Sequence, residues 1–173
     1  MSRRELGFAA LLFGLVLAVY APVWNAGFVW DDDAHVTDNP VLESASGLAA
    51  AWTRLDATPQ YYPLTHTSFW IDHALWGTNP RGYHAVNVLL HALSSILLWR
   101  LLVFLELPGA LLAAAIFAVH PVHVESVAWI TERKNVLSTA LALGAATLFL
   151  RSKGSPWGAV VLYAAALLAK TVT

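Results

Sequence analysis

Long stretches without a charged side chain are the feature that most constrains how this chain can fold. The first stretch, residues 6–24, reads LGFAALLFGLVLAVYAPVW and is long enough to cross the hydrocarbon core of a bilayer as a helix. Only 12% of all residues are charged and 58% are hydrophobic, whereas about 25% of the residues in soluble domains are charged. The sequence therefore predicts an all-α integral membrane protein with a polytopic helical bundle.

Further apolar runs predict additional spans. The predicted spans are 6–24, 84–104, 109–130 with an interruption at 120–121, 136–150 and 157–173. Arg3 and Arg4 precede the first span and predict a cytoplasmic N-terminus, because cytoplasmic flanks are enriched in Arg and Lys. Alternating crossings then place two loops, 25–83 and 120–135, on the outer face of the membrane.

The first outer loop is long and rich in carboxylates. Within it, residues 45–56 place Leu48, Trp52 and Leu55 on one face of a helix, which predicts a short amphipathic helix on the membrane surface. Prolines are expected to divide the remainder into short pieces. These prolines are Pro40, Pro59, Pro63 and Pro80.

Composition excludes several classes of function. The chain has no cysteine, which excludes disulfides, thiolate metal ligands and a cysteine nucleophile. Its formal net charge is −1, so the basic surface of a nucleic-acid-binding protein is not expected. Membrane lipids are the partners that the apolar runs predict, and many of the eight tryptophans lie near the ends of these runs, where aromatic rings anchor at lipid headgroups.

Three consecutive carboxylates, Asp31, Asp32 and Asp33, follow the first span. A carboxylate in such a position is suited to act as a general base, and two together are suited to hold a divalent cation through oxygen ligands. The sequence does not decide between base and ligand. Asp31 and Asp32 are therefore the candidate catalytic residues and also the candidate ligands of any metal, with a solvated acidic loop as the alternative.

A second polar motif, HPVHVE at 120–125, follows the apolar part of the third span. Two histidines and a carboxylate are zinc ligands in many proteins, but this spacing differs from H-E-x-x-H and Pro121 disturbs helical geometry. We therefore expect His120, His123 and Glu125 to hydrogen-bond a substrate or the aspartates from across the site.

Two cations lie in the second outer loop, where spanning proteins carry few of them. Arg133 presents a planar fork suited to phosphate and Lys134 presents a point charge. We expect both to bind the phosphate of a lipid whose tail lies in the bilayer. The alternative is a solvated turn in which Glu132 pairs with one of the cations.

Polar residues also occur within the second span. His84, Asn87 and His91 share one face of a helix, and such residues usually hydrogen-bond between helices. His84 lies at the outer end, so it is also a candidate wall of the substrate site.

Five strings carry a resemblance to a known family. They are FVWDDDAHVTDNP (28–40), YYPLTHTSFWIDHALWG (61–77), YHAVNVLLHALSS (83–95), FAVHPVHVESVAWITERKNVLS (117–138) and LLAKTVT (167–173). In this order they resemble the transmembrane and tetratricopeptide-repeat containing proteins and their bacterial relatives. The membrane half of that family is similar to GT-C glycosyltransferases, such as protein O-mannosyltransferases.

The resemblance implies a GT-C-like bundle in a bacterial inner membrane, with its active site on the outer face. It also implies a polyprenyl-phosphate donor that carries mannose, and a Ser or Thr hydroxyl of a protein as acceptor. Asp31 and Asp32 match the acidic pair of the first outer loop, where such enzymes have their catalytic base. His120, His123 and Glu125 match the H-P-x-H-x-E segment of the family.

Later spans and the repeat array of that family are missing from the sequence, so it resembles an N-terminal fragment. Glycosyl transfer is the favoured function, and a divalent metal is an open question. The alternative is a non-catalytic membrane scaffold that anchors a tetratricopeptide-repeat domain. A transporter half is disfavoured, because transporters bind substrates at the bilayer midplane and these spans carry almost no charge there.

Overall fold

The computed structural model describes residues 2–152 and 154–171, and every regular element in these ranges is helical. The predicted all-α class is therefore confirmed. In chain order the elements are α1 (Arg3–Val19), η1 (Ala21–Asn25), η2 (Asp33–Thr37), η3 (Pro40–Glu43), α2 (Ala45–Thr53), α3 (Pro63–Trp76), α4 (Pro80–Phe104), α5 (Ala110–Val119), η4 (Pro121–His123), α6 (Val124–Ala128), α7 (Arg133–Arg151) and α8 (Trp157–Ala169).

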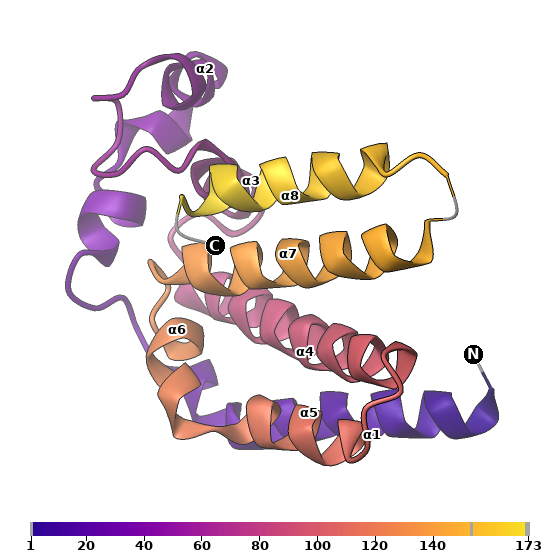
Figure 1. The fold of residues 1–173 in the computed structure, drawn as a ribbon. Helices are drawn as coiled ribbons and strands as arrows, with labels where there is room; N and C mark the ends of the chain where they lie inside the picture. The colour runs from indigo at the N-terminus through magenta and orange to yellow at the C-terminus, as the bar shows by residue number, and fades with distance from the viewer. Residues whose placement is uncertain (1, 153, 172–173) are drawn as a thin grey trace.

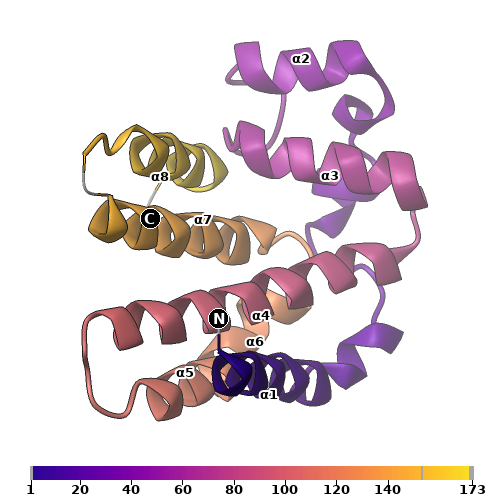
Figure 2. The same ribbon diagram turned by 90° about the vertical axis from the view of Figure 1, so that its right-hand side faces the viewer.

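The long helices form a bundle in which α4 packs against α1, α5 and α7, and α7 packs against α8 (Figures 1 and 2). The start of α1, the turn between α4 and α5 and the connection between α7 and α8 lie at one end of this bundle. The short elements η1, η2, α2 and α6, the start of α7 and the end of α8 lie at the other, which we call the loop-rich end (Figures 1 and 2).

One helix of the described residues, α4, is both long and apolar enough to cross a membrane. The consecutive pair of Ala110–Val119 and Pro121–Ala128 passes the same test only as a single unit, and it is bent by 48°. The described residues thus contain one or two helices of spanning length, fewer than the polytopic bundle that the sequence predicted. The predicted span 6–24 overlaps the 17-residue helix α1, which ends at Val19 and is followed by a 3₁₀ turn from Ala21 with Pro22 in its first positions.

Two other helices begin earlier than the predicted spans. α4 begins at Pro80, where Asn79 Oδ1 accepts a hydrogen bond from Arg81 N at 3.2 Å and caps the first turn. α7 begins at Arg133, so the cations of the second outer loop belong to its first turn. Residues 172 and 173, at the end of the predicted fifth span, lie outside the described residues.

The first outer loop contains a 14-residue helix, α3, that the sequence analysis missed. The prolines of residues 25–83 were expected to break this region into short pieces. Pro63 instead occupies the first turn of α3, where its missing N–H costs no hydrogen bond. The buried face of α3 carries Thr65, His66, Phe69 and Asp72. A polar helix therefore packs inside what the sequence presents as an acidic loop.

The predicted amphipathic helix at 45–56 is represented by α2, which ends at Thr53. Leu55 lies beyond its end and is 77% exposed, so it does not share the packed face. Trp52 Nε1 instead donates a hydrogen bond to Thr67 Oγ1 at 2.9 Å, which joins α2 to α3.

Buried apolar side chains form separate clusters along the bundle. The cluster at the loop-rich end includes Val36, Leu42, Phe69, Tyr83 and Ile130, and it joins α3 and α4 to the segments before and after them. The middle cluster joins α1, α4, α5, α6 and α7, and a third cluster lies around Trp99. The loop-rich end is thus held by a core of its own, which gives its polar side chains fixed positions.

Close packing of α2 on η3 predicts that Gly47→Ala destabilises the protein. A Cβ at this position would overlap the backbone oxygen of Val41, so the backbone would have to shift, at a cost of about 1–3 kcal/mol. Gly14→Ala in α1 is the control, since no atom lies within 4 Å of its added Cβ. Thermal unfolding in detergent should show a lower Tm for Gly47→Ala only, and equal Tm values would contradict this packing.

Candidate functional site

Arg133 lies at the centre of the loop-rich end, with a side chain that is 0% exposed. Its Nη1 lies 2.7 Å from Asp72 Oδ2, forming an ion pair, and its Nη2 donates to the backbone oxygen of Tyr83 at 2.9 Å. Its Nε donates to Asn87 Oδ1, and its guanidinium carbon lies 5.0 Å from the centre of the Phe69 ring. One side chain therefore connects the first turn of α7 to both α3 and α4.

The buried environment of Arg133 argues against the phosphate-binding role that the sequence predicted for this residue. A buried guanidinium needs a buried counter-ion, and here that counter-ion is Asp72, which is 3% exposed. Burial raises the pKa of the Asp72 carboxyl, and the facing guanidinium opposes this rise. Contact between Arg133 and a donor phosphate would require the ion pair to open, so the arrangement favours a structural role.

Asp32 is also buried, at 0% exposed, and it joins two segments that lie far apart in the sequence. Its Oδ1 accepts hydrogen bonds from Thr131 N at 2.9 Å and Thr131 Oγ1 at 2.5 Å, and its Oδ2 accepts from Val29 N at 2.8 Å. The structure thus brings the acidic run of the first outer loop against the start of α7, with Asp32 as the connecting group.

Asp31 has a different environment from its neighbour, because 48% of its side chain is exposed. One carboxylate oxygen lies 3.7 Å from His35 Nε2, one turn further along the chain. Asp33 is exposed as well, but its Oδ1 accepts a hydrogen bond from Thr37 Oγ1 at 3.1 Å, within η2. Of the two predicted catalytic carboxylates, Asp31 is therefore the one that a substrate can reach.

Two buried histidines stack beside Asp31. The rings of His35 and His66 lie 5.6 Å apart and are nearly parallel, at 9°. Burial lowers the pKa of His66 to about 4, and the neighbouring His35 adds to this effect. Burial also lowers the pKa of His35, while Asp31 opposes the change. Both rings are therefore neutral at pH 7.

A second group of polar side chains lies at the start of α7 and the end of α8, and its Lys134 interacts electrostatically with both histidines. Lys134 Nζ lies 2.8 Å from Glu132 Oε1. The alternative prediction of an ion pair with Glu132 is therefore present, but the two side chains are only 11% and 13% exposed and do not form a solvated turn. Asn135 Nδ2 donates to Glu132 Oε2, and Lys170 Nζ donates to Asn135 Oδ1. We call the whole group the outer polar cluster. It consists of Asp31, His35, His66, Glu132, Lys134, Asn135 and Lys170.

The histidine motif at 120–125 lies beside this cluster. The His123 ring lies 4.4 Å from the Phe117 ring, centre to centre, and is tilted by 55° to it. His123 also lines a cavity of about 500 Å³ together with Asn135 and Lys170. His120 is exposed, and its Nδ1 accepts a hydrogen bond from Val122 N at 3.2 Å. Glu125 is exposed on α6. Of the motif's three predicted supporting residues, only His123 lines this cavity.

His84 occupies a different position from the one expected. Its ring is 1% exposed, within electrostatic range of Asp32, and it lines a separate groove between α1 and α4 with Tyr20 and Trp24. Across residues 2–152 and 154–171, no three His, Asp or Glu side chains converge as a metal site would require. The aspartates, with Asp32 already bonded on both oxygens, are therefore not grouped as a cation site here.

Sequence reasoning missed several residues of this region, namely His35, His66, Asp72 and Lys170. His66 and Asp72 project from α3, whose helical nature was not recognised. The signal was present as the spacing of Thr65, Phe69 and Asp72 at i, i+4 and i+7, which marks one face of a helix.

Comparison with known proteins shows clear relatives. Protein O-mannosyl-transferase TMTC3 of Homo sapiens is 32% identical over 89% of this chain, and Protein O-mannosyl-transferase Tmtc1 of Drosophila melanogaster is 34% identical over 94%. Protein O-mannosyl-transferase F38B6.6 of Caenorhabditis elegans is 30% identical over 83%. The chain is similar to protein O-mannosyl-transferases.

The similarity covers a limited part of these transferases. The chain spans about a fifth of the length of the relatives, at 18%, 20% and 23%. No protein-family model and no solved structure matches it. The relatives' names describe those longer proteins, and the chemistry of this chain must be argued from the residues described above.

The burial of Arg133 predicts that replacing either Arg133 or Asp72 alone destabilises the protein. Arg133→Met or Asp72→Asn should each lower the free energy of unfolding by about 3–5 kcal/mol, because the partner is left buried without its counter-ion. The double variant Arg133→Met/Asp72→Asn should lose less than the sum of the single changes, because neither charge is then left buried without a partner. Differential scanning fluorimetry in detergent measures these shifts.

The control for this experiment is Arg54→Ala, which breaks an ion pair with Asp56 whose side chains are 64% and 75% exposed. Loss of such an exposed ion pair should leave the Tm of the protein unchanged. Equal effects of Arg54→Ala and Arg133→Met would show that Arg133 does not hold the fold together.

The stacked histidines predict a loss of stability in acid. Their folded pKa values lie below the ordinary value of about 6.5, so the unfolded chain takes up these protons first. Their contribution to the free energy of unfolding is complete above about pH 6.5 and is lost as the pH falls. For His66 the loss continues down to its folded pKa of about 4, at about 1.4 kcal/mol per pH unit. Tm measured from pH 7 to 4.5 should fall less steeply for His66→Gln, and an unchanged slope would contradict the assignment.

Proposed function

We propose that this chain belongs to the transmembrane and tetratricopeptide-repeat containing family and forms part of a GT-C-type glycosyltransferase. The reaction is transfer of mannose from a polyprenyl-phosphate donor to a Ser or Thr hydroxyl of a protein. The observation that carries the proposal is the similarity to protein O-mannosyl-transferases over 83–94% of the chain. The exposed carboxylate of Asp31, within the outer polar cluster, supports it.

The chain is proposed to be a multi-pass protein of a bacterial inner membrane, with the loop-rich end on the outer face. The helices of the bundle expose large apolar side chains far from that end, including Leu112 at 67% and Val161 at 64%. Such an apolar surface is suited to lipid. Arg3 and Arg4 begin α1 at the opposite end of the bundle, which supports a cytoplasmic N-terminus (Figure 1).

In the proposed mechanism, the Asp31 carboxylate takes the proton of the acceptor hydroxyl. The hydroxyl oxygen then attacks the anomeric carbon of the donor sugar with inversion. The bond between that carbon and the phosphate oxygen breaks, and polyprenyl phosphate leaves with the electron pair. His35 Nε2 lies 3.7 Å from one carboxylate oxygen of Asp31, and 48% of the Asp31 side chain remains exposed, which leaves room for an acceptor.

Asp32 is proposed to position the base and to take no proton itself. Its three hydrogen bonds to Val29 and Thr131 fix the loop that carries Asp31 against the start of α7. Replacing Asp32 should therefore reduce stability and activity together.

The base assignment predicts a selective loss of turnover. Asp31→Asn in the full-length protein should lower kcat by about 10²–10⁴-fold, with donor binding retained, because a general base contributes about that factor. Asp33→Asn is the matched control, since Asp33 is exposed and bonds to Thr37 within η2. The assay follows transfer of labelled mannose from polyprenyl-phosphate-mannose to an acceptor protein.

Three outcomes are informative. Normal transfer by Asp31→Asn would refute the base assignment. Equal losses in Asp31→Asn and Asp33→Asn would indicate a general effect of loop charge. Absence of both donor binding and transfer in the wild type, across a panel of lipid-linked sugars, would instead support the non-catalytic scaffold.

A further inference from the structure

A hollow with two arginines lies at the end of the bundle opposite the loop-rich end, which we call the inner end (Figure 1). The first turn of α1 and the C-terminal parts of α4 and α7 form this hollow, and its volume is about 190 Å³. We call it the inner pocket. Its lining consists of Glu5, Trp99, Arg100, Val103, Phe104 and Arg151.

The charges of both arginines are available in the described part of the chain. In residues 2–152 and 154–171, neither Arg100 nor Arg151 forms an ion pair with a carboxylate. Glu5 interacts electrostatically with Arg100, but its Oε2 accepts a hydrogen bond from Ser2 N at 2.6 Å and so caps α1. The guanidinium carbon of Arg151 lies 5.5 Å from the centre of the Phe104 ring, which holds this cation beside α4. A ring face attracts a cation without accepting all of its N–H donors.

Positive charge exceeds negative charge at the inner end. Among the residues that the structure describes, this end carries four arginines and two glutamates. They are Arg3, Arg4, Arg100, Arg151, Glu5 and Glu106. The inner end therefore attracts an anion.

Exposed apolar side chains adjoin the two cations. Val103 and Phe104 line the inner pocket and are 48% and 43% exposed, and Leu6 of α1 is 56% exposed. A small anion dissolved in water gains little from such surfaces, whereas a phospholipid covers them with its acyl chains. The combination of cations with apolar side chains favours a lipid headgroup over a soluble anion.

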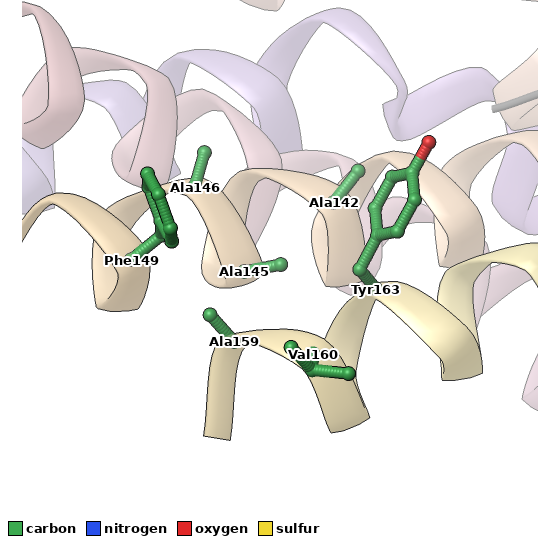
Figure 3. Close-up of a pocket in the computed structure, with 7 residues that line it drawn as sticks. All are labelled: Ala142, Ala145, Ala146, Phe149, Ala159, Val160 and Tyr163. Carbon is green, nitrogen blue, oxygen red and sulfur yellow. The ribbon is translucent and has the colours of Figure 1, made fainter. Parts of the chain in front are cut away.

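Two other hollows have different linings. A groove of about 410 Å³ between α7 and α8 is lined by four alanines with Phe149, Val160 and Tyr163, and all seven are uncharged (Figure 3). The cavity beside His123 contains one lysine, but Lys170 Nζ donates a hydrogen bond there. The inner pocket differs from both, because it joins two arginines without carboxylate partners to exposed apolar side chains.

We propose that the inner pocket binds the phosphodiester of an anionic phospholipid, such as phosphatidylglycerol. Arg100 and Arg151 donate hydrogen bonds to the phosphate oxygens, and the acyl chains cover Val103 and Phe104. Basic pockets between helices on the cytoplasmic side of a membrane are suited to such headgroups. The ligand is a lipid of the surrounding membrane that the protein does not consume. This inference rests on the membrane placement proposed above and is independent of the transferase reaction, since Asp31 lies at the opposite end.

A lipid titration tests the inner pocket. Fluorescent phosphatidylglycerol is titrated into the full-length protein in detergent. Arg100→Gln and Arg151→Gln should each weaken binding about fivefold, and the two together, the glutamine pair, about 25-fold, because an arginine near an anionic headgroup contributes about that factor. Arg81→Gln is the matched control and should bind like the wild type, since Arg81 is exposed at the opposite end of α4.

A charge-preserving variant keeps the test decisive if the glutamine pair disturbs folding. Arg100→Lys/Arg151→Lys retains both positive charges and loses only the planar forks. It should bind phosphatidylglycerol more tightly than the glutamine pair does. Equal affinities of these two double variants would overturn the role of the charges.

Other results would overturn the proposal as well. These are equal affinity of the wild type for phosphatidylcholine, wild-type affinity in the glutamine pair, and an equal loss in Arg81→Gln. Displacement of the lipid by inorganic phosphate, measured against sodium chloride at the same ionic strength, would instead indicate a site for a soluble phosphate compound.

This inference and the proposed function fail in different ways. Asp31→Asn should bind phosphatidylglycerol like the wild type. Arginine-dependent binding without transfer of any sugar would refute the transferase and leave the inner pocket standing. Normal mannose transfer together with wild-type lipid binding in the glutamine pair would refute the inner pocket and leave the transferase standing.

Discussion

The enclosed ion pair between Arg133 and Asp72 is the constraint on which the loop-rich end depends. A guanidinium removed from water must find a counter-ion and hydrogen-bond acceptors, and Arg133 finds them on α3 and α4 at once. Because its donors have fixed directions, these two helices can satisfy it only in one relative arrangement. The first turn of α7 is thereby held against a helix that lies some sixty residues earlier in the chain.

The position of the acidic run follows from this arrangement. Thr131 lies two residues before Arg133, and it binds Asp32 through both its backbone N–H and its hydroxyl. The ion pair therefore holds the segment before α7 in place, and Thr131 in this segment holds Asp32. Neighbouring carboxylates with the same charge obtain different roles in this way, since Asp32 is enclosed and Asp31 remains open to solvent.

The same segment sets the direction of α7 and so the shape of the groove that α7 forms with α8. Small side chains along this part of α7 let α8 approach closely; a Cβ on Gly144 would lie 3.4 Å from Leu162. The polar residues of both helices meet near the outer polar cluster, whereas their apolar residues extend away from it. An exposed carboxylate, a lysine and an apolar groove thus lie close to one short segment of the chain.

Much of this organisation could be predicted from local sequence. The helical class was predicted from the long apolar runs. The two polar motifs at Asp31 and at 120–135 could be located by composition and by the family resemblance. Local sequence could not assign α3, because Pro63 was taken as a breaker although it begins that helix. It also could not distinguish Arg133 from Lys134 or Asp31 from Asp32.

The sequence by itself determined the helical class, the apolar character of the bundle and the residue types at one end of it. Only the tertiary structure decided which charged groups are enclosed. That choice depends on contacts between distant segments, such as Asp72 with Arg133 and Asp32 with Thr131, and no local pattern encodes which partner a side chain meets. Enclosure in turn decides chemistry, because a charged group with a buried partner holds the fold, whereas a similar group at the surface can reach a substrate.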